Sequence, residues 1–304
     1  MKTGRSSKIE NIIFNSCNGA LMLVIALGML YPFWNTIAVS FNEAMDTLRG
    51  GITLFPRKPS LYNYKIIFST GTIFHAFLVS VTRTVINMIT GVFFTSMIAY
   101  VLSRKHFFMR KPFTLILVLS MYVNAGLIPN YFLIKNLGML NSFWVYIIPG
   151  MVSAFNFVVI RTYMRTIPES IIESARIDGC GDFIIFLRII LPLCLPVLAT
   201  VALFLAVGAW NSWFDTMIYN SGKVHLHTLQ YKLMEYLQSS QSRSRAATDA
   251  AAVAASQAQG SVNMITPVSI RAAITVIAAA PILAIYPFMQ RYFVVGLNIG
   301  GVKE

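Results

Sequence analysis

Residues 173–192 read ESARIDGCGDFIIFLRIILP. They overlap Arg161–Ile190, which is the most charged stretch of the chain. This stretch carries four acidic and four basic side chains and lies between two long apolar runs. A simple connector between two apolar helices would be shorter and less charged. The stretch therefore predicts a structured segment with a task of its own.

Local signals divide this stretch into two short helices. Pro168 suits the first turn of a helix, because its missing N–H group is not needed there. Gly179 suits the position just after a helix, where the backbone turns left-handed. A second helix, Phe183–Ile190, then leads into Pro192, with Asp182 as the expected N-cap. We expect a helix–turn–helix with one charged and one apolar face, the apolar one carrying Ile171, Ile172 and Ala175.

The composition outside this stretch is that of a membrane protein. Hydrophobic residues make up 56% of the chain and charged residues 12%, with a mean hydropathy of +0.66. A soluble domain carries about 25% charged residues. Several apolar runs reach the roughly 20 residues that a helix needs to cross a bilayer. The net charge of +13 comes from residues scattered at the ends of those runs, which indicates membrane topology rather than nucleic-acid binding.

The apolar runs predict an all-α integral membrane protein with six transmembrane helices in a single domain, residues 1–304. The first run begins with basic residues and has no small-residue cleavage site, so we expect it to be a retained helix. The expected spans are Ile12–Val39, Ile73–Leu102, Phe113–Ile134, Phe143–Tyr163, Leu191–Trp210 and Arg271–Phe293.

Short loops set the orientation. Ser103–Pro112 holds four basic and no acidic residues, whereas Lys135–Ser142, on the other side, holds one basic residue. The positive-inside rule then places both termini and the loop 164–190 in the cytoplasm. Residues 211–270 form a long outer loop. Its middle, Ser239–Gly260, is either a flexible or helical excursion or a low-complexity insertion.

The central stretch resembles the EAA loop of ABC import permeases, whose pattern is Glu-Ala-Ala, three residues, Gly, nine residues, Ile-x-Leu-Pro. Every spacing fits, and Ser174 in place of alanine is the one departure. The C-terminal segment YPFMQRYFVVGL, residues 286–297, also resembles carbohydrate permeases. The resemblance is to the maltose-type class and its lipoprotein/polygalacturonan-type branch, and it covers most of the chain.

This resemblance implies a transport subunit of a bacterial inner-membrane importer, with no catalytic site. Its partners would be a second homologous permease, two ATP-binding subunits, an extracytoplasmic solute-binding protein and the lipid bilayer. The cargo would be an oligosaccharide, and the analogy extends to acidic ones such as alginate or pectin fragments. The residues expected to couple to the ATPase are Glu169, Glu173, Ser174, Ala175, Arg176, Asp178 and Gly179.

No nucleotide site is expected in the chain itself. The sole Gly-Lys pair, Gly222-Lys223, continues with Val224 and has Met217 where a phosphate loop needs its first glycine. ATP and Mg²⁺ would therefore bind to partner subunits. A secondary transporter is the alternative, but no span carries an acidic residue of the kind that ion coupling uses. No span carries the side chains of a membrane-embedded enzyme either.

A sugar path should offer aromatic rings and hydrogen-bonding groups. The candidates are Arg83, Tyr122, Asn124, Tyr131, Asn156, Trp210, Asn211, Trp213 and Asp215. The two tryptophans could equally form an interfacial aromatic belt. Asn124 and Asn156 could equally bond one helix to another.

Arg83 stands inside an apolar run, where a charge is a functional candidate. It would suit an acidic cargo as a cation in the pore, but we expect it to extend outward to the interface instead. The three cysteines predict no disulfide, and His225 and His227 alone predict no metal site.

Overall fold

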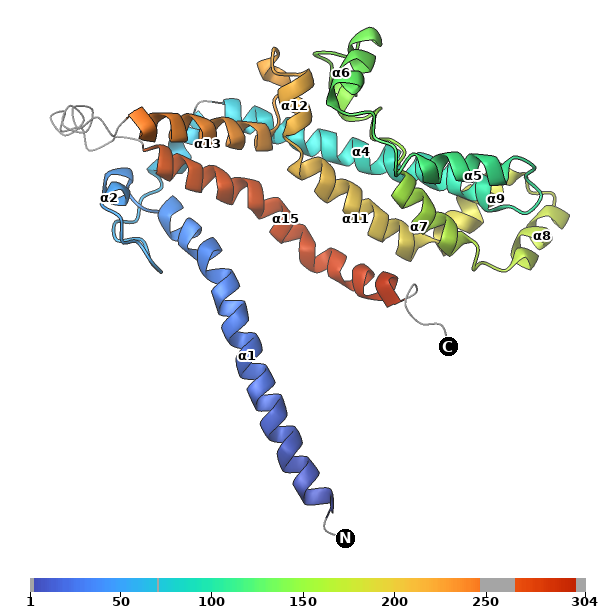
Figure 1. Ribbon diagram of the computed structural model, residues 1–304, viewed down its shortest axis with the longest axis horizontal. Helices are drawn as coiled ribbons and strands as arrows, with labels where there is room; N and C mark the ends of the chain where they lie inside the picture. Colours follow the sequence, from blue (N-terminus) through green and yellow to red (C-terminus); the bar gives the residue numbers. More distant parts are fainter. Residues whose placement is uncertain (1–2, 70, 247–265, 299–304) are drawn as a thin grey trace. The chain divides into compact units, whose positions relative to one another are not determined.

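The computed structural model describes residues 3–69, 71–246 and 266–298. These residues form helices and no strand, with one isolated bridge between Asn42 and Pro59. The chain divides into two compact units: residues 1–70 with 236–279, and residues 71–235 with 280–304. The helices are drawn in Figure 1. They are α1 (Thr3–Ser40), α2 (Ala44–Leu48), α3 (Tyr62–Ser69), α4 (Thr72–Ser103), α5 (Arg110–Leu119), α6 (Leu127–Asn136), η1 (Phe143–Tyr146), α7 (Ala154–Met164), α8 (Glu169–Ile177), α9 (Asp182–Ile185), η2 (Phe186–Ile190), α10 (Leu191–Leu193), α11 (Leu195–Asn211), α12 (Phe214–Tyr219), η3 (Val224–Leu226), α13 (Leu229–Ala246) and α15 (Pro267–Asn298).

Three helical segments in the described residues are long and apolar enough to cross a membrane: Asn11–Ser40, Thr72–Ser103 and Val268–Ile285. A fourth crossing is possible if Asp182–Leu193 and Leu195–Asn211, which meet at an angle of 84°, count as one broken span. The helices predicted for the first, second and sixth spans therefore lie within α1, α4 and α15. The count of six spans stays a prediction.

The first unit has an ordered polar cluster directly after α1. The Asn63 amide donates to the carbonyls of Ser40 and Asn42, at 3.0 and 2.9 Å. Asp46 accepts hydrogen bonds from Asn42 and Arg57, both at 3.0 Å. The bond from Asn42 is the largest influence that holds the pKa of Asp46 below its ordinary value. The predicted loop after the first span thus contains two short helices, α2 and α3, joined by side-chain hydrogen bonds.

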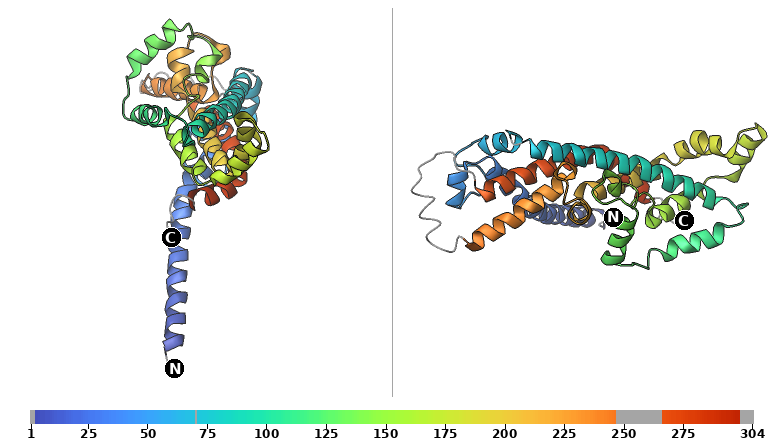
Figure 2. Two further views of the ribbon diagram at one scale, coloured as in Figure 1. Left: turned by 90° about the vertical axis from the view of Figure 1, so that its right-hand side faces the viewer. Right: turned by 90° about the horizontal axis from the view of Figure 1, so that it is seen from above.

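The second unit is built around α4, with α7 and α11 packed along it (Figures 1 and 2). Its core contains Phe157, Ile160 and Val201, which are fully buried. Gly91 of α4 lets α11 approach closely, because a Cβ at this position would lie 2.8 Å from Leu205 Cδ1. A side chain at position 91 would therefore force Leu205 of α11 to move.

We expect Gly91→Leu to lower the stability of the chain by about 1–3 kcal/mol, as overpacking of a filled core does. The measurement is thermal unfolding of the purified protein in detergent. Gly208→Ala is the matched control on α11, because a Cβ there has no atom within 4 Å. Equal melting temperatures for the two variants would contradict the close approach at Gly91.

The third and fourth predicted spans are not continuous helices. Over Phe113–Ile134 the chain forms α5 and then α6, separated at Gly126, whose φ of +87° is left-handed. The Asn124 side chain accepts from Gly126 N at 2.9 Å and stabilises this turn. Over Phe143–Tyr163 a 3₁₀ turn, η1, precedes α7. Hydropathy does not register such breaks, because the turn residues are themselves largely apolar.

The fifth predicted span, Leu191–Trp210, is also interrupted. It comprises α10 and α11, with Cys194 between them and Pro196 in the first turn of α11. Proline lacks the N–H group that would continue the preceding helix, which accounts for the sharp bend. Of the segment 239–260 expected in the outer loop, residues up to Ala246 belong to α13, and residues 247–260 lie outside the described part.

Candidate functional site

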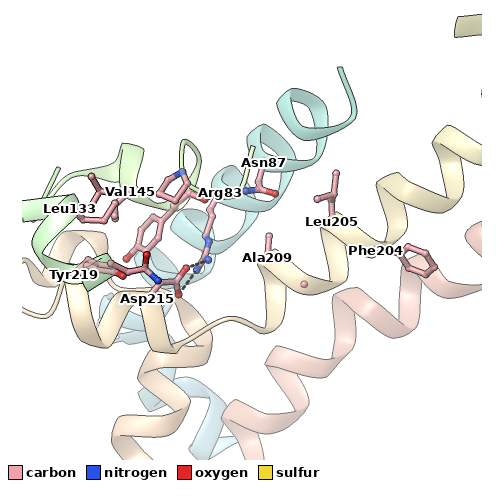
Figure 3. A pocket seen from close by; sticks show the side chains of 15 residues that line it. Arg83, Asn87, Leu133, Val145, Phe204, Leu205, Ala209, Asp215 and Tyr219 are labelled. Atoms are coloured by element: carbon pink, nitrogen blue, oxygen red, sulfur yellow. Dashed lines mark hydrogen bonds and ion pairs between the residues drawn. The ribbon is translucent and has the colours of Figure 1, made fainter. Parts of the chain in front are cut away.

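A cavity of about 590 Å³ lies within the second unit, between α4, α6, η1, α11 and α12. Its walls are mostly apolar, with a few polar groups that converge on the interior (Figure 3). Size and lining are those of a small-molecule site. The lining residues are Arg83, Asn87, Asn130, Leu133, Ile134, Val145, Tyr146, Pro149, Gly150, Phe204, Leu205, Gly208, Ala209, Asp215 and Tyr219.

An ion pair between Arg83 and Asp215 dominates the polar wall, and the two side chains point toward each other (Figure 3). Arg83 Nη2 contacts Asp215 Oδ2, and Nη1 donates to Oδ1 at 3.3 Å. Nη1 also donates to the Ser212 carbonyl at 3.2 Å. The pair joins the first half of α4 to the first turn of α12.

Both charged side chains make further contacts that stabilise them. Arg83 is 3% exposed, and its Cζ lies 4.4 Å from the centroid of the Tyr146 ring. Asp215 Oδ1 accepts from Ser212 Oγ at 2.7 Å and from Thr216 N at 3.1 Å. The Asp215 carboxylate therefore keeps two other donors near the start of α12, whereas the buried guanidinium has Asp215 as its counterion.

Two other polar groups of the cavity wall are not engaged in hydrogen bonds within the described part of the fold. In the described residues, neither the Asn130 amide nor the Tyr219 hydroxyl has a hydrogen-bond partner. The Tyr219 ring stacks on Tyr131, with centroids 6.3 Å apart and planes 10° from parallel. Asn87, in contrast, donates to the Tyr146 carbonyl at 3.1 Å.

The structure brings only part of the predicted path together. Arg83 and Asp215 line the cavity, and Tyr131 touches its wall through Tyr219. The other six candidates lie elsewhere. Tyr122 and Asn124 are exposed in the turn after α5, Asn156 is buried in the first turn of α7, Trp210 packs edge-to-face on Phe77, Asn211 is exposed at the end of α11, and Trp213 packs on Phe214.

The expected extension of Arg83 outward to the membrane interface stays a prediction. Its side chain is 4% exposed, because Asp215, 132 residues away in sequence, supplies a counterion inside the fold. Sequence reasoning missed Asn87, Asn130, Tyr146 and Tyr219. Asn87 had a signal, since it follows Arg83 by four residues on the same face of an apolar helix.

The predicted helix–turn–helix is present as α8, a turn, and α9 with η2, at the end of α4 where Ser103 lies (Figures 1 and 2). Gly179 has φ +81°. Cys180 N donates to Ala175 O and Gly179 N to Arg176 O, both at 3.0 Å. These two bonds form the Schellman motif that ends α8.

The helix–turn–helix differs from prediction at Ile171, at Ala175 as a coupling residue, and at Asp182. Ile172 and Ala175 are buried in the unit's core, but Ile171 is exposed. Ala175 therefore packs inward and is not part of the exposed surface. Asp182 is the first residue of α9 rather than its N-cap, because its carboxylate accepts from Arg176 Nη2 at 2.8 Å instead.

Glu169, at the start of α8, is paired within the chain. Its carboxylate lies 2.8 Å from Lys105 Nζ, in the segment that follows α4. The hydrogen bond from Lys105 is the main reason that the pKa of Glu169 is below its ordinary value. Glu173, Ser174, Arg176 and Asp178 are exposed and form the outer face of α8.

We expect Lys105→Gln to loosen α8 at neutral pH and to have no effect in acid. A carboxylate with a lowered pKa stabilises the fold above its ordinary value of 4.5, and this contribution disappears as the pH falls through the lower folded value. Hydrogen exchange of the α8 amides at pH 7 and below the folded pKa measures the difference. Lys111→Gln is the control, because Lys111 lies in the same basic segment and has no ion pair within the described part of the chain. An effect of Lys105→Gln that persists in acid would argue against the pair.

His225 and His227 lie near the ends of η3. Nε2 of His227 lies 3.2 Å from the Ser221 carbonyl, and Nε2 of His75 lies 2.8 Å from the His225 carbonyl. No group of three metal-ligand side chains occurs in the described residues.

Residues 74–298 match the model of a protein family described as binding-protein-dependent transport system inner membrane component. The match includes the cavity and the α8 segment, and it spans well over half of the chain.

Two relatives from Bacillus subtilis (strain 168) are similar over nearly their whole length. The polygalacturonan/rhamnogalacturonan transport system permease protein YtcP is 34% identical over 303 residues, which cover 97% of this chain and 100% of the relative. Protein LplC is 35% identical over 303 residues, covering 99% and 96%.

The fold is similar to a solved structure as well. A chain in the crystal structure of a bacterial ABC transporter involved in the import of the acidic polysaccharide alginate superposes with a TM-score of 0.81. The two chains are 26% identical, and the match covers 96% of this chain and 99% of that one.

Proposed function

Because the chain belongs to the family of binding-protein-dependent transport system inner membrane components, we propose that it forms an oligosaccharide path together with a second permease subunit. It is a permease subunit of a carbohydrate ABC importer, a transport component rather than an enzyme, and not a secondary transporter. The pairing with a second permease and the route through the cavity are the parts that we propose.

The exposed face of α8 is the observation that carries the mechanism. Glu173, Ser174, Arg176 and Asp178 face outward, while Ile172 and Ala175 fix the helix to the core. A charged face on a rigidly held helix suits docking into a pocket of an ATP-binding partner. Two such partners would bind ATP and Mg²⁺, and an extracytoplasmic solute-binding protein would deliver the cargo.

Because α8 is packed on the core of the unit, a movement of α8 can be transmitted to the cavity. Ile172 and Ala175 belong to the same core as Ala99 of α4 and Val201 of α11. The cavity wall includes Arg83 and Asn87 of α4 and Gly208 of α11. A push on α8 by a closing ATPase dimer would therefore move α4 and α11 as packed bodies and change access to the cavity.

The chain functions in the inner membrane. Both termini and α8 would face the cytoplasm, since the basic segment Ser103–Pro112 leads away from α4 on the same side as α8. The six-span count belongs to this proposal, with α5–α6 and η1–α7 as interrupted crossings.

The cargo would be an oligosaccharide. The name of YtcP mentions polygalacturonan and rhamnogalacturonan, and the transporter in the solved structure is involved in the import of alginate. Fragments of pectin or alginate are therefore the first substrates to test.

The test is purification of the tagged chain from cells that express the whole importer, combined with uptake assays. We expect an ATP-hydrolysing subunit to co-purify, and uptake of labelled oligosaccharides to stop with vanadate but to continue after a protonophore collapses the proton gradient. Uptake that depends on the ion gradient and proceeds without an ATPase subunit would contradict the proposal.

A further inference from the structure

The Arg83–Asp215 pair leaves the cavity without a free charge. These two are the ionisable acid and base among its lining residues, and their charges cancel. Nη1 and Nη2 of Arg83 both contact Asp215, and Tyr146 covers the guanidinium face. Nε of Arg83 is buried and has no hydrogen-bond partner in the described residues.

A carboxylate on the cargo would therefore find no receptor here. To bind Arg83 it would have to displace Asp215 or share one cation with it. Sharing brings two negative charges close together, which is unfavourable. The intuitive role of Arg83, a cation for acidic sugars, is inconsistent with this geometry.

The polar groups of the cavity wall that lack a hydrogen-bond partner in the described residues suit a neutral sugar instead. Asn130 and the Tyr219 hydroxyl can exchange hydrogen bonds with sugar hydroxyls, and the C–H face of a sugar ring packs well on an aromatic ring. The α11 wall borders open space at Gly208, since a Cβ there would have no atom within 4 Å. Ligand sites typically have volumes of about 300–1,000 Å³, and this cavity of about 590 Å³ lies in that range.

We propose that this cavity binds an uncharged saccharide unit and discriminates against a unit that carries a carboxylate at the same position. The inference rests on the proposed oligosaccharide path and specifies the chemistry of its site. An importer of acidic oligosaccharides would then have to neutralise the carboxylates outside this cavity, for instance on its partner permease.

The experiment measures binding of matched disaccharides to the purified importer complex in nanodiscs. α-1,4-Galactobiose and digalacturonate differ only at C6, as do β-1,4-mannobiose and dimannuronate. We expect the neutral member of at least one pair to bind roughly tenfold more tightly than its acid, as unfavourable pairing of like charges implies.

Two leucine variants assign the binding to the cavity. Gly208→Leu adds a side chain at the open wall and should abolish binding of the neutral disaccharide. Gly28→Leu, on α1, also has no atom within 4 Å of the added Cβ and should leave binding unchanged. Binding that survives Gly208→Leu would overturn the proposal.

Two other outcomes overturn it as well. One is no binding of any of the four compounds. The other is tighter binding of an acid whose preference disappears in Arg83→Gln, which would make Arg83 a carboxylate receptor. Vanadate-sensitive uptake by cells tests the importer function independently. The proposed importer function can therefore be correct even if the cavity does not prefer neutral sugars.

Discussion

Gly179→Asp should lower the rate of oligosaccharide uptake by at least tenfold, while the permease still folds and reaches the membrane. Gly179 lies between Asp178 and the helix that starts at Asp182, so a third carboxylate would enter the outer surface next to α8. An ATPase pocket that accepts this surface would meet added bulk and added negative charge. We expect ATP hydrolysis by the complex to continue without being coupled to uptake.

The chain offers a matched control for this change. Gly138 also follows a helix, α6, with φ +66°, and has the same Schellman bonds, from Gly138 N to Lys135 O and from Met139 N to Ile134 O. Gly138→Asp therefore imposes the same backbone strain away from α8, and should keep ATPase docking intact. Gly179→Asn separates charge from size. Normal uptake by Gly179→Asp would refute docking at this turn.

Asp215→Asn should destabilise the protein more than Arg83→Gln. Loss of Asp215 leaves a guanidinium that is 4% exposed without its counterion, and removal of one partner from a buried pair costs about 3–5 kcal/mol. Loss of Arg83 leaves a carboxylate that is 23% exposed and still accepts from Ser212 and Thr216. We therefore expect a smaller cost for Arg83→Gln, about 2 kcal/mol, within the range for a partly compensated polar group.

The double variant Arg83→Gln/Asp215→Asn completes a double-mutant cycle. It should recover most of the lost stability, because no charge is then left unpaired. The measurement is the melting temperature of the purified protein in detergent. Glu235→Gln is the control, since it breaks the Lys232–Glu235 pair on α13, in which the Glu235 side chain is 51% exposed, and it should cost about 1 kcal/mol. Additive losses in the double variant would mean that the two charges do not stabilise each other.

Much of the fold was predictable because its signals are local. Apolar runs define α1, α4 and α15, and positional chemistry defines the ends of α8: Pro168 precedes it and Gly179 ends it. The breaks at Gly126 and at Cys194 were missed. A turn made of apolar residues has the same hydropathy as a helix, so the window that detects spans does not detect such turns.

The sequence by itself determined the membrane class, the charged helix–turn–helix and the family resemblance, because each depends on neighbouring residues or fixed spacing. Only the tertiary structure decided that Ala175 faces inward, that Glu169 pairs with Lys105, and that Arg83 meets Asp215. The last pair joins positions 132 residues apart. No local pattern encodes such a contact, since it arises when α4 and α11 pack against each other and bring the α11–α12 turn to the guanidinium.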